Sequence, residues 1–168
     1  MLISEETRDQ LNELVRYSFD ANAVVDNYAY NLAYYHFPNI EKIVHKSFAH
    51  KFPVFSDIIT DMMIELDARP VRKGLKDHEE DFDGNLYKIF DGVLALCNDY
   101  RRSIIKTIEV AELNEDYEVK IKLEEFLLMF EPYRKQADVW FTYAARYQGD
   151  DKSFDVHFED ITTLISIE

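Results

Sequence analysis

Four long helical patterns constrain this chain more than any other feature of its sequence. Apolar residues recur every three or four positions across residues 5–36, 39–67, 84–113 and 115–148, which places them on one face of an α-helix. Each pattern covers about 30 residues, so each predicted helix is roughly 45 Å long at 1.5 Å per residue. Helices of this length pack with nearly parallel axes, which predicts an all-α four-helix bundle.

The joints between these patterns indicate how the helices are connected. The first and last joints are about two residues long, which favours antiparallel neighbours, whereas residues 68–83 form a polar connection that can cross the bundle from end to end. Pro53 predicts a kink or a break in the second helix, and Pro132 predicts a bend in the fourth. We therefore expect a bundle over residues 1–149 and a C-terminal tail over 150–168, the tail having some strand-like alternation.

The composition narrows the class of protein. A chain of 168 residues with 47% hydrophobic residues has the material for one domain with a real core. Its single cysteine, Cys97, rules out an intrachain disulfide and suits a reducing compartment. We find no apolar run long enough for a membrane span and no basic, apolar leader at the N-terminus, so we expect a cytoplasmic protein without membrane contact.

Several kinds of functional site are absent from the sequence. The di-iron centre inside ferritin-like bundles needs two Glu-x-x-His pairs, and this sequence contains none. The run from Asp81 to Asn85 begins like a calcium-binding loop, but Leu86 replaces the required glycine. No glycine-rich phosphate loop is present.

Three segments resemble Dps-type miniferritins of the ferritin-like superfamily. The segment Ser56–Pro70 is similar to the end of that family's second helix, with two acidic residues four apart followed by an apolar stretch and a proline. Tyr35-His36-Phe37 lies where the family has a histidine and an aromatic residue, and Lys135–Ala145 is similar to its Trp-containing last helix. The resemblance implies a ferritin-like four-helix bundle with a long connection between helices 2 and 3.

The resemblance also implies a metal site and an assembly. Its ligands are His36 from one subunit and Asp57 and Asp61 from a twofold mate, which bind iron(II) between the two subunits. The implied function is to oxidise and sequester iron inside a hollow homo-oligomer and so protect against oxidative stress. Asp61 stands where the family usually has Glu, and the segment before Asp57 is shorter than usual, so His45 or His50 is an alternative counterpart of a family histidine.

The residues themselves leave two interpretations open. Asp57 and Asp61 are four apart and share a helix face with His50, and carboxylate with imidazole suits iron, manganese or zinc. Alternatively, the two carboxylates form a solvated acidic flank, and His36 interacts with the last carbonyls of its helix. The second interpretation corresponds to a metal-free ferritin-like assembly or protein-binding module without catalytic activity.

The net charge of −14, from 33 acidic and 19 basic residues, predicts that the protein does not bind DNA. Affinity for a duplex comes from neutralising phosphates with Lys and Arg, and an acidic surface repels them. We expect no shift of duplex DNA in a gel at physiological salt without divalent cations. A persistent shift under those conditions would contradict this prediction.

Overall fold

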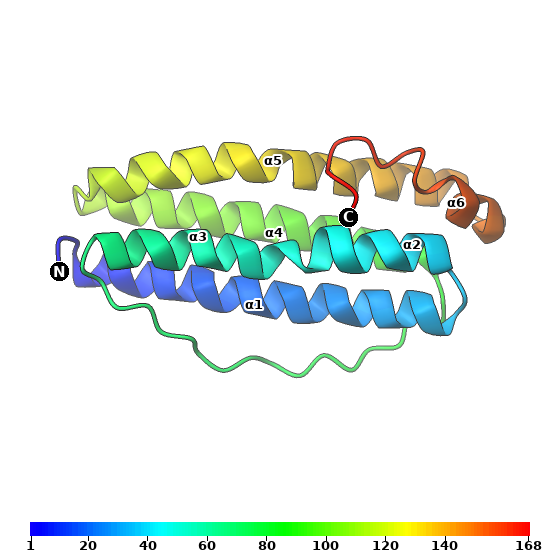
Figure 1. Ribbon diagram of the computed structural model, residues 1–168, viewed down its shortest axis with the longest axis horizontal. Coiled ribbons are helices and arrows are strands. Elements are labelled where there is room, and N and C mark those ends of the chain that lie inside the picture. Colours follow the sequence, from blue (N-terminus) through cyan, green and yellow to red (C-terminus); the bar gives the residue numbers. More distant parts are fainter.

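The computed structural model describes residues 1–168 and confirms the predicted all-α four-helix bundle (Figure 1). In chain order the helices are α1 (Glu5–Tyr34), α2 (Pro38–Ile43), the π-helix η1 (Val44–Ala49), α3 (Lys51–Glu65), α4 (Leu86–Leu113), α5 (Tyr117–Arg146) and α6 (Asp151–His157). The segment from α2 to α3 returns antiparallel to α1, and α5 returns antiparallel to α4. None of these helices combines the length and the hydropathy that a membrane span requires.

The second predicted helix is divided into three pieces, and both divisions lie before Pro53. Residues 38–65 form α2, then η1, then a turn at His50, and only then α3. Pro53 occupies the first turn of α3, where a helix tolerates a residue without an amide hydrogen. The predicted break therefore lies just before the proline. In contrast, α5 continues through Pro132.

The long connection, residues 66–85, runs along α1 from one end of the bundle to the other (Figure 1). Its backbone is held at Val71, whose N–H donates to Asn12 Oδ1 at 2.8 Å, and at Phe82, whose N–H donates to Asn31 Oδ1 at 3.1 Å. Between these points His78 Nε2 lies 2.8 Å from Asp20 Oδ1. This path lets α3 and α4 run in the same direction.

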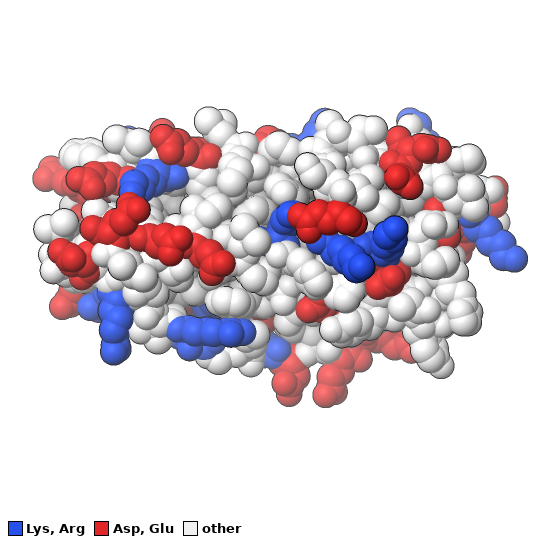
Figure 2. All heavy atoms as spheres, viewed as in Figure 1, with Lys and Arg blue, Asp and Glu red and all other residues white.

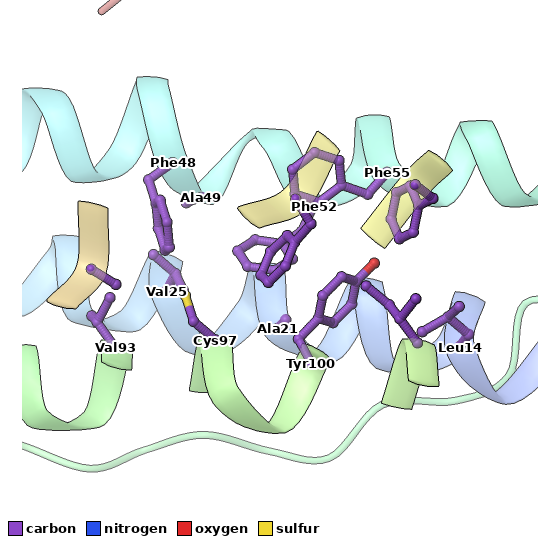
Figure 3. Close-up of a cluster of buried hydrophobic side chains, with 14 of the residues drawn as sticks. Leu14, Ala21, Val25, Phe48, Ala49, Phe52, Phe55, Val93, Cys97 and Tyr100 are labelled. Carbon is purple, nitrogen blue, oxygen red and sulfur yellow. The ribbon is translucent and has the colours of Figure 1, made fainter. Parts of the chain in front are cut away.

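The bundle core is dense in aromatic side chains (Figure 3). Phe52 and Tyr100 lie edge to face with ring centroids 5.3 Å apart, and both side chains are fully buried. The Tyr100 hydroxyl is satisfied by Ser18 Oγ at 2.7 Å. Because each large apolar side chain contributes about 1.5–3 kcal/mol on burial, this core supplies much of the driving force for folding.

The C-terminal tail packs onto the bundle as the short helix α6 followed by turns, and the alternation over residues 154–167 forms no strand. Phe158 is fully buried and stacks on Trp140 with ring centroids 5.1 Å apart. Trp140 Nε1 donates to Thr162 Oγ1 at 2.9 Å. Asp155 of α6 accepts from the N–H groups of Asn39 and Ile40 at 3.1 and 3.0 Å and thus caps the free start of α2.

This packing predicts that the tail contributes to the stability of the whole bundle. Phe158→Ala should lower the free energy of unfolding by about 3–5 kcal/mol, because it leaves a cavity beside Trp140. The matched change Val156→Ala, at a side chain that is 65% exposed, should alter it by no more than about 0.5 kcal/mol. Urea unfolding measures both, and equal effects would mean that the tail does not share the core.

Candidate metal centre

The interior of the bundle has no set of metal ligands. Its only buried carboxylate is Asp155, which caps α2, and no histidine or glutamate is buried. In the middle of the bundle, the buried side chains of Phe48, Phe52, Cys97 and Tyr100 fill the space between the helices instead (Figure 3). The interior therefore lacks the buried glutamate and histidine side chains that an interior di-iron centre requires.

One cluster of potential ligands lies outside this core, between α1 and η1. It consists of Asp26, His45 and His50, and one ligand atom from each lies within 4.8 Å of the others. Asp26 and His45 are partly buried and His50 is exposed. The cluster is thus open to solvent on one side.

The π-helical turn brings the two histidines together. Residues five apart in an α-helix are rotated by about 140° around the axis, so their side chains diverge. In a π-helix the i→i+5 hydrogen bond places residue i+5 nearly above residue i. Here the His50 N–H donates to the His45 carbonyl at 3.2 Å, and the two imidazole centroids are 4.6 Å apart.

The Asp26 carboxylate faces this pair from α1. Its Oδ1 atom is buried without a hydrogen-bond partner and lies 3.5 Å from His45 Nε2. Burial raises the pKa of Asp26, while the imidazoles of His45 and His50 and a hydrogen bond from Asn22 act in the opposite direction. A buried acceptor without a partner costs free energy, and a bound cation would remove that cost.

Glu41 has the position of an outer-shell partner for His45. Its Oε1 atom lies 3.3 Å from His45 Nδ1, on the opposite side of the ring from Asp26. A histidine that binds a metal through one nitrogen usually donates its other N–H to a carboxylate, which fixes the tautomer and the ring orientation. The arrangement therefore leaves His45 Nε2 free to bind a metal beside Asp26.

The separation of the Asp26 and His45 atoms fits a shared metal. Two ligand atoms at about 2.0–2.2 Å from a tetrahedral metal are about 3.3–3.6 Å apart, and the observed distance is 3.5 Å. Two imidazoles with one carboxylate and open positions form the ligand set typical of non-haem iron(II), and imidazole also suits zinc.

The structure places His36 at the end of α1, where it has a backbone role. Its φ of 68° is the left-handed conformation that commonly ends a helix. The N–H groups of His36 and Phe37 donate to the carbonyls of Ala33 and Leu32 at 3.2 and 2.9 Å, which satisfies the last turn. The side chain is exposed.

Asp57 and Asp61 are both exposed on α3, and neither forms an ion pair within the chain. Within one chain they do not join a histidine in a group of three ligands. The site implied by the resemblance therefore needs a second chain to supply His36. The two alternative histidines, His45 and His50, both belong to the observed cluster. His50 therefore lies with His45 and not with Asp57 and Asp61.

Sequence reasoning missed Asp26 because the residue lies within the long first pattern. The available signal was its spacing from Asn22, since the two polar residues are four apart and lie beside the buried Ala21 and Val25. The π-turn gave no such signal, because the sequence pattern was interpreted as an α-helix, in which side chains five residues apart, such as His45 and His50, point in different directions.

Ferritins of known structure have the same fold. An open-pore ferritin from the hyperthermophilic archaeon Archaeoglobus fulgidus superposes with a TM-score of 0.88 at 12% identity, covering 95% of this chain and 96% of that one. A humanized archaeal ferritin gives the same TM-score and identity over 95% and 97% of the two chains. The chain thus has the ferritin-type four-helix bundle fold. No protein-family model and no curated protein matches its sequence.

The burial of Asp26 predicts a pH-dependent cost in the metal-free protein. Folding raises the pKa of the Asp26 carboxyl, so the folded chain binds a proton there more tightly than the unfolded chain does. Stability is therefore lost as the pH rises from the ordinary Asp pKa of about 3.9 through the raised pKa of the folded state. With a chelator present, Asp26→Asn should therefore raise stability at pH 7 by up to about 1 kcal/mol, and the gain should shrink towards pH 4. Thermal melts across this range measure the difference.

The exposed change Asp57→Asn is the control and should have little effect on the melting temperature. A lower melting temperature for metal-free Asp26→Asn at pH 7 would show that the carboxylate stabilises the fold without any cation.

Proposed function

We propose that the protein is a ferritin-like iron-binding protein whose iron(II) site is formed by Asp26, His45 and His50. The observation that carries this proposal is the convergence of these three ligand atoms within 4.8 Å. Two features support it: Asp26 Oδ1 is buried without a hydrogen-bond partner, and the carboxylate of Glu41 lies behind His45. Both are features that metal sites have and that a solvated surface cluster does not require.

The donor set favours iron(II) as the cargo of this site. Two imidazoles hold iron(II), and the Asp26 carboxylate becomes a stronger ligand as the iron loses an electron to dioxygen or a peroxide and becomes iron(III). The exposed His50 side leaves open positions through which iron and an oxidant can enter. Oxidation and sequestration inside a hollow homo-oligomer, with protection against oxidative stress, would then follow as in the miniferritins that the sequence resembles.

A second iron site between subunits belongs to the same proposal. Asp57 and Asp61 are exposed, lie four apart on α3 and have no partner within the chain. His36 is exposed at the far end of α1. A twofold neighbour that placed its α1 end against α3 would complete the ligand set that the resemblance implies.

The alternative function is a metal-free assembly or protein-binding module. The observation that favours it is the interior of the bundle. Aromatic side chains occupy the region where ferritin-like di-iron proteins have their metal ligands. A chain of this kind would use the bundle only as a scaffold.

Metal titration separates these functions. Under anaerobic conditions we expect iron(II), or cobalt(II) as a stable substitute, to bind the wild type, and His45→Ala to weaken binding by about 100-fold or more, because one of three ligands is lost. Glu41→Gln should weaken it by about 10-fold. Calorimetry and the visible absorption of cobalt(II) report both affinity and geometry.

Two variants serve as controls for this titration. His157→Ala removes an exposed histidine of α6 and should bind like the wild type. Asp57→Asn combined with Asp61→Asn tests the intersubunit site. Loss of binding in that double variant but not in His45→Ala would assign the metal to the intersubunit site, and no binding by the wild type would favour the metal-free module.

A further inference from the structure

An apolar groove with an acidic rim lies between α3 and α5, at the end of the bundle far from α6. Its volume is about 500 Å³, and its buried lining residues include Ile59, Met62 and Phe126. The carboxylates of Asp61, Glu65 and Glu125 line its rim, and acidic side chains gather on this part of the surface (Figure 2). We call this pocket the α3/α5 groove. It is lined by Ile58, Ile59, Asp61, Met62, Glu65, Lys122, Leu123, Glu125, Phe126 and Met129.

The charge of the groove is only partly neutralised within the chain. Lys122 pairs with Glu65 at 2.5 Å, and Glu65, Glu118 and Glu125 together raise the pKa of Lys122. Asp61 and Glu125 form no ion pair. The groove therefore offers apolar contact area together with unpaired negative charge, which suits a basic segment that carries apolar side chains.

The chain itself contains such a segment in its long connection. Residues 69–76, with the sequence Arg-Pro-Val-Arg-Lys-Gly-Leu-Lys, carry four basic side chains and no acidic one. Val71 and Leu75 are 37% and 40% exposed within it. We call residues 69–76 the basic strap.

Most of the charge of the strap is also unused within the chain. Lys73 pairs with Glu13, and the Arg72 guanidinium lies 3.9 Å above the Phe19 ring without an ion pair. Arg69 and Lys76 form no ion pair and are exposed. The strap thus presents positive charge and two apolar side chains in a chain whose net charge is −14.

The strap cannot fill the groove of its own chain. Its backbone is held on α1, where the Val71 N–H donates to Asn12 Oδ1 at 2.8 Å. The groove is lined by residues of α3 and α5, and these two helices lie on another side of the bundle from the connection along α1 (Figure 1). The same anchoring keeps the strap in a fixed shape, which lowers the entropic cost of binding it to another molecule.

We propose that the basic strap of one copy of this chain docks into the α3/α5 groove of a second copy. Arg69, Arg72 and Lys76 then face Glu65 and Glu125, and Val71 and Leu75 cover the groove floor. Opposite charges that meet at contact distance are little affected by the net repulsion between copies, since charges more than about 8 Å apart are screened at physiological salt. The two surfaces differ, so the contact is head-to-tail and closes into a ring or cage when its rotation allows.

Charge reversal on each surface tests this contact. The groove variant Glu65→Lys with Glu125→Lys and the strap variant Arg72→Glu with Lys76→Glu should each weaken self-association by about 10-fold or more, because each places like charges opposite one another. An equimolar mixture of the two variants should associate again, since each reversed surface then meets a complementary one. Sedimentation velocity in the presence of a chelator measures this independently of the metal site.

A control variant separates the loss of this contact from a general effect of net charge. Lys88→Glu with Lys152→Glu changes the net charge as the strap variant does, at exposed residues outside both surfaces, and should associate like the wild type. Circular dichroism shows whether each variant is folded. Failure of the mixture to associate, or association of both folded variants at wild-type strength, would overturn the contact.

The molecular mass of the wild type in solution also tests the contact. A single species near 19.9 kDa at about 100 µM, a concentration that detects weak micromolar contacts, would also overturn the proposal. If a synthetic basic amphipathic peptide then bound the groove, the surface would belong to a different protein partner.

Discussion

The absence of an amide hydrogen at Pro53 shapes the part of the bundle on which the candidate site depends. A regular helix through residues 38–65 would need the Pro53 nitrogen to donate to the Ala49 carbonyl, which it cannot do. The chain instead makes a π-turn over Val44–Ala49 and begins α3 at Lys51. Phe48 and Phe52 still enter the core on either side of this break. The local irregularity is therefore tolerated because the aromatic packing continues across it.

The same irregularity gives the two faces of the segment different surroundings. The inward face packs Phe48 and Phe52 against each other with centroids 5.6 Å apart. The outward face carries His45 and His50, which only the π-turn brings within ligand distance of Asp26. Substitutions on the inward face can thus change stability without altering the proposed metal ligands, although both faces belong to one short stretch of chain.

The sequence predicted the fold well because the fold depends on periodic apolar residues. Leu11, Leu14, Ala21 and Val25 recur along α1, and all four are buried. The tail was harder to predict because its helix is short. The spacing of Phe154 and Phe158 indicates a buried helix face only once Trp140 is known to lie opposite them. The candidate site was harder still, since Asp26 and His45 are distant in sequence and a π-turn departs from the period on which helix patterns are recognised. His45 and His50 could be named in advance, but not their pairing with each other.

The π-turn also bears on how such a site could arise and disappear during evolution. A π-turn contains one residue more than the α-helical turn it replaces, so a single inserted or deleted codon near residues 44–49 is enough to convert one into the other. The four long helices, the strap along α1 and the capped start of α2 would be unchanged by that event. The proposed metal site could therefore be acquired or lost in one genetic step, while the bundle that carries it is inherited intact.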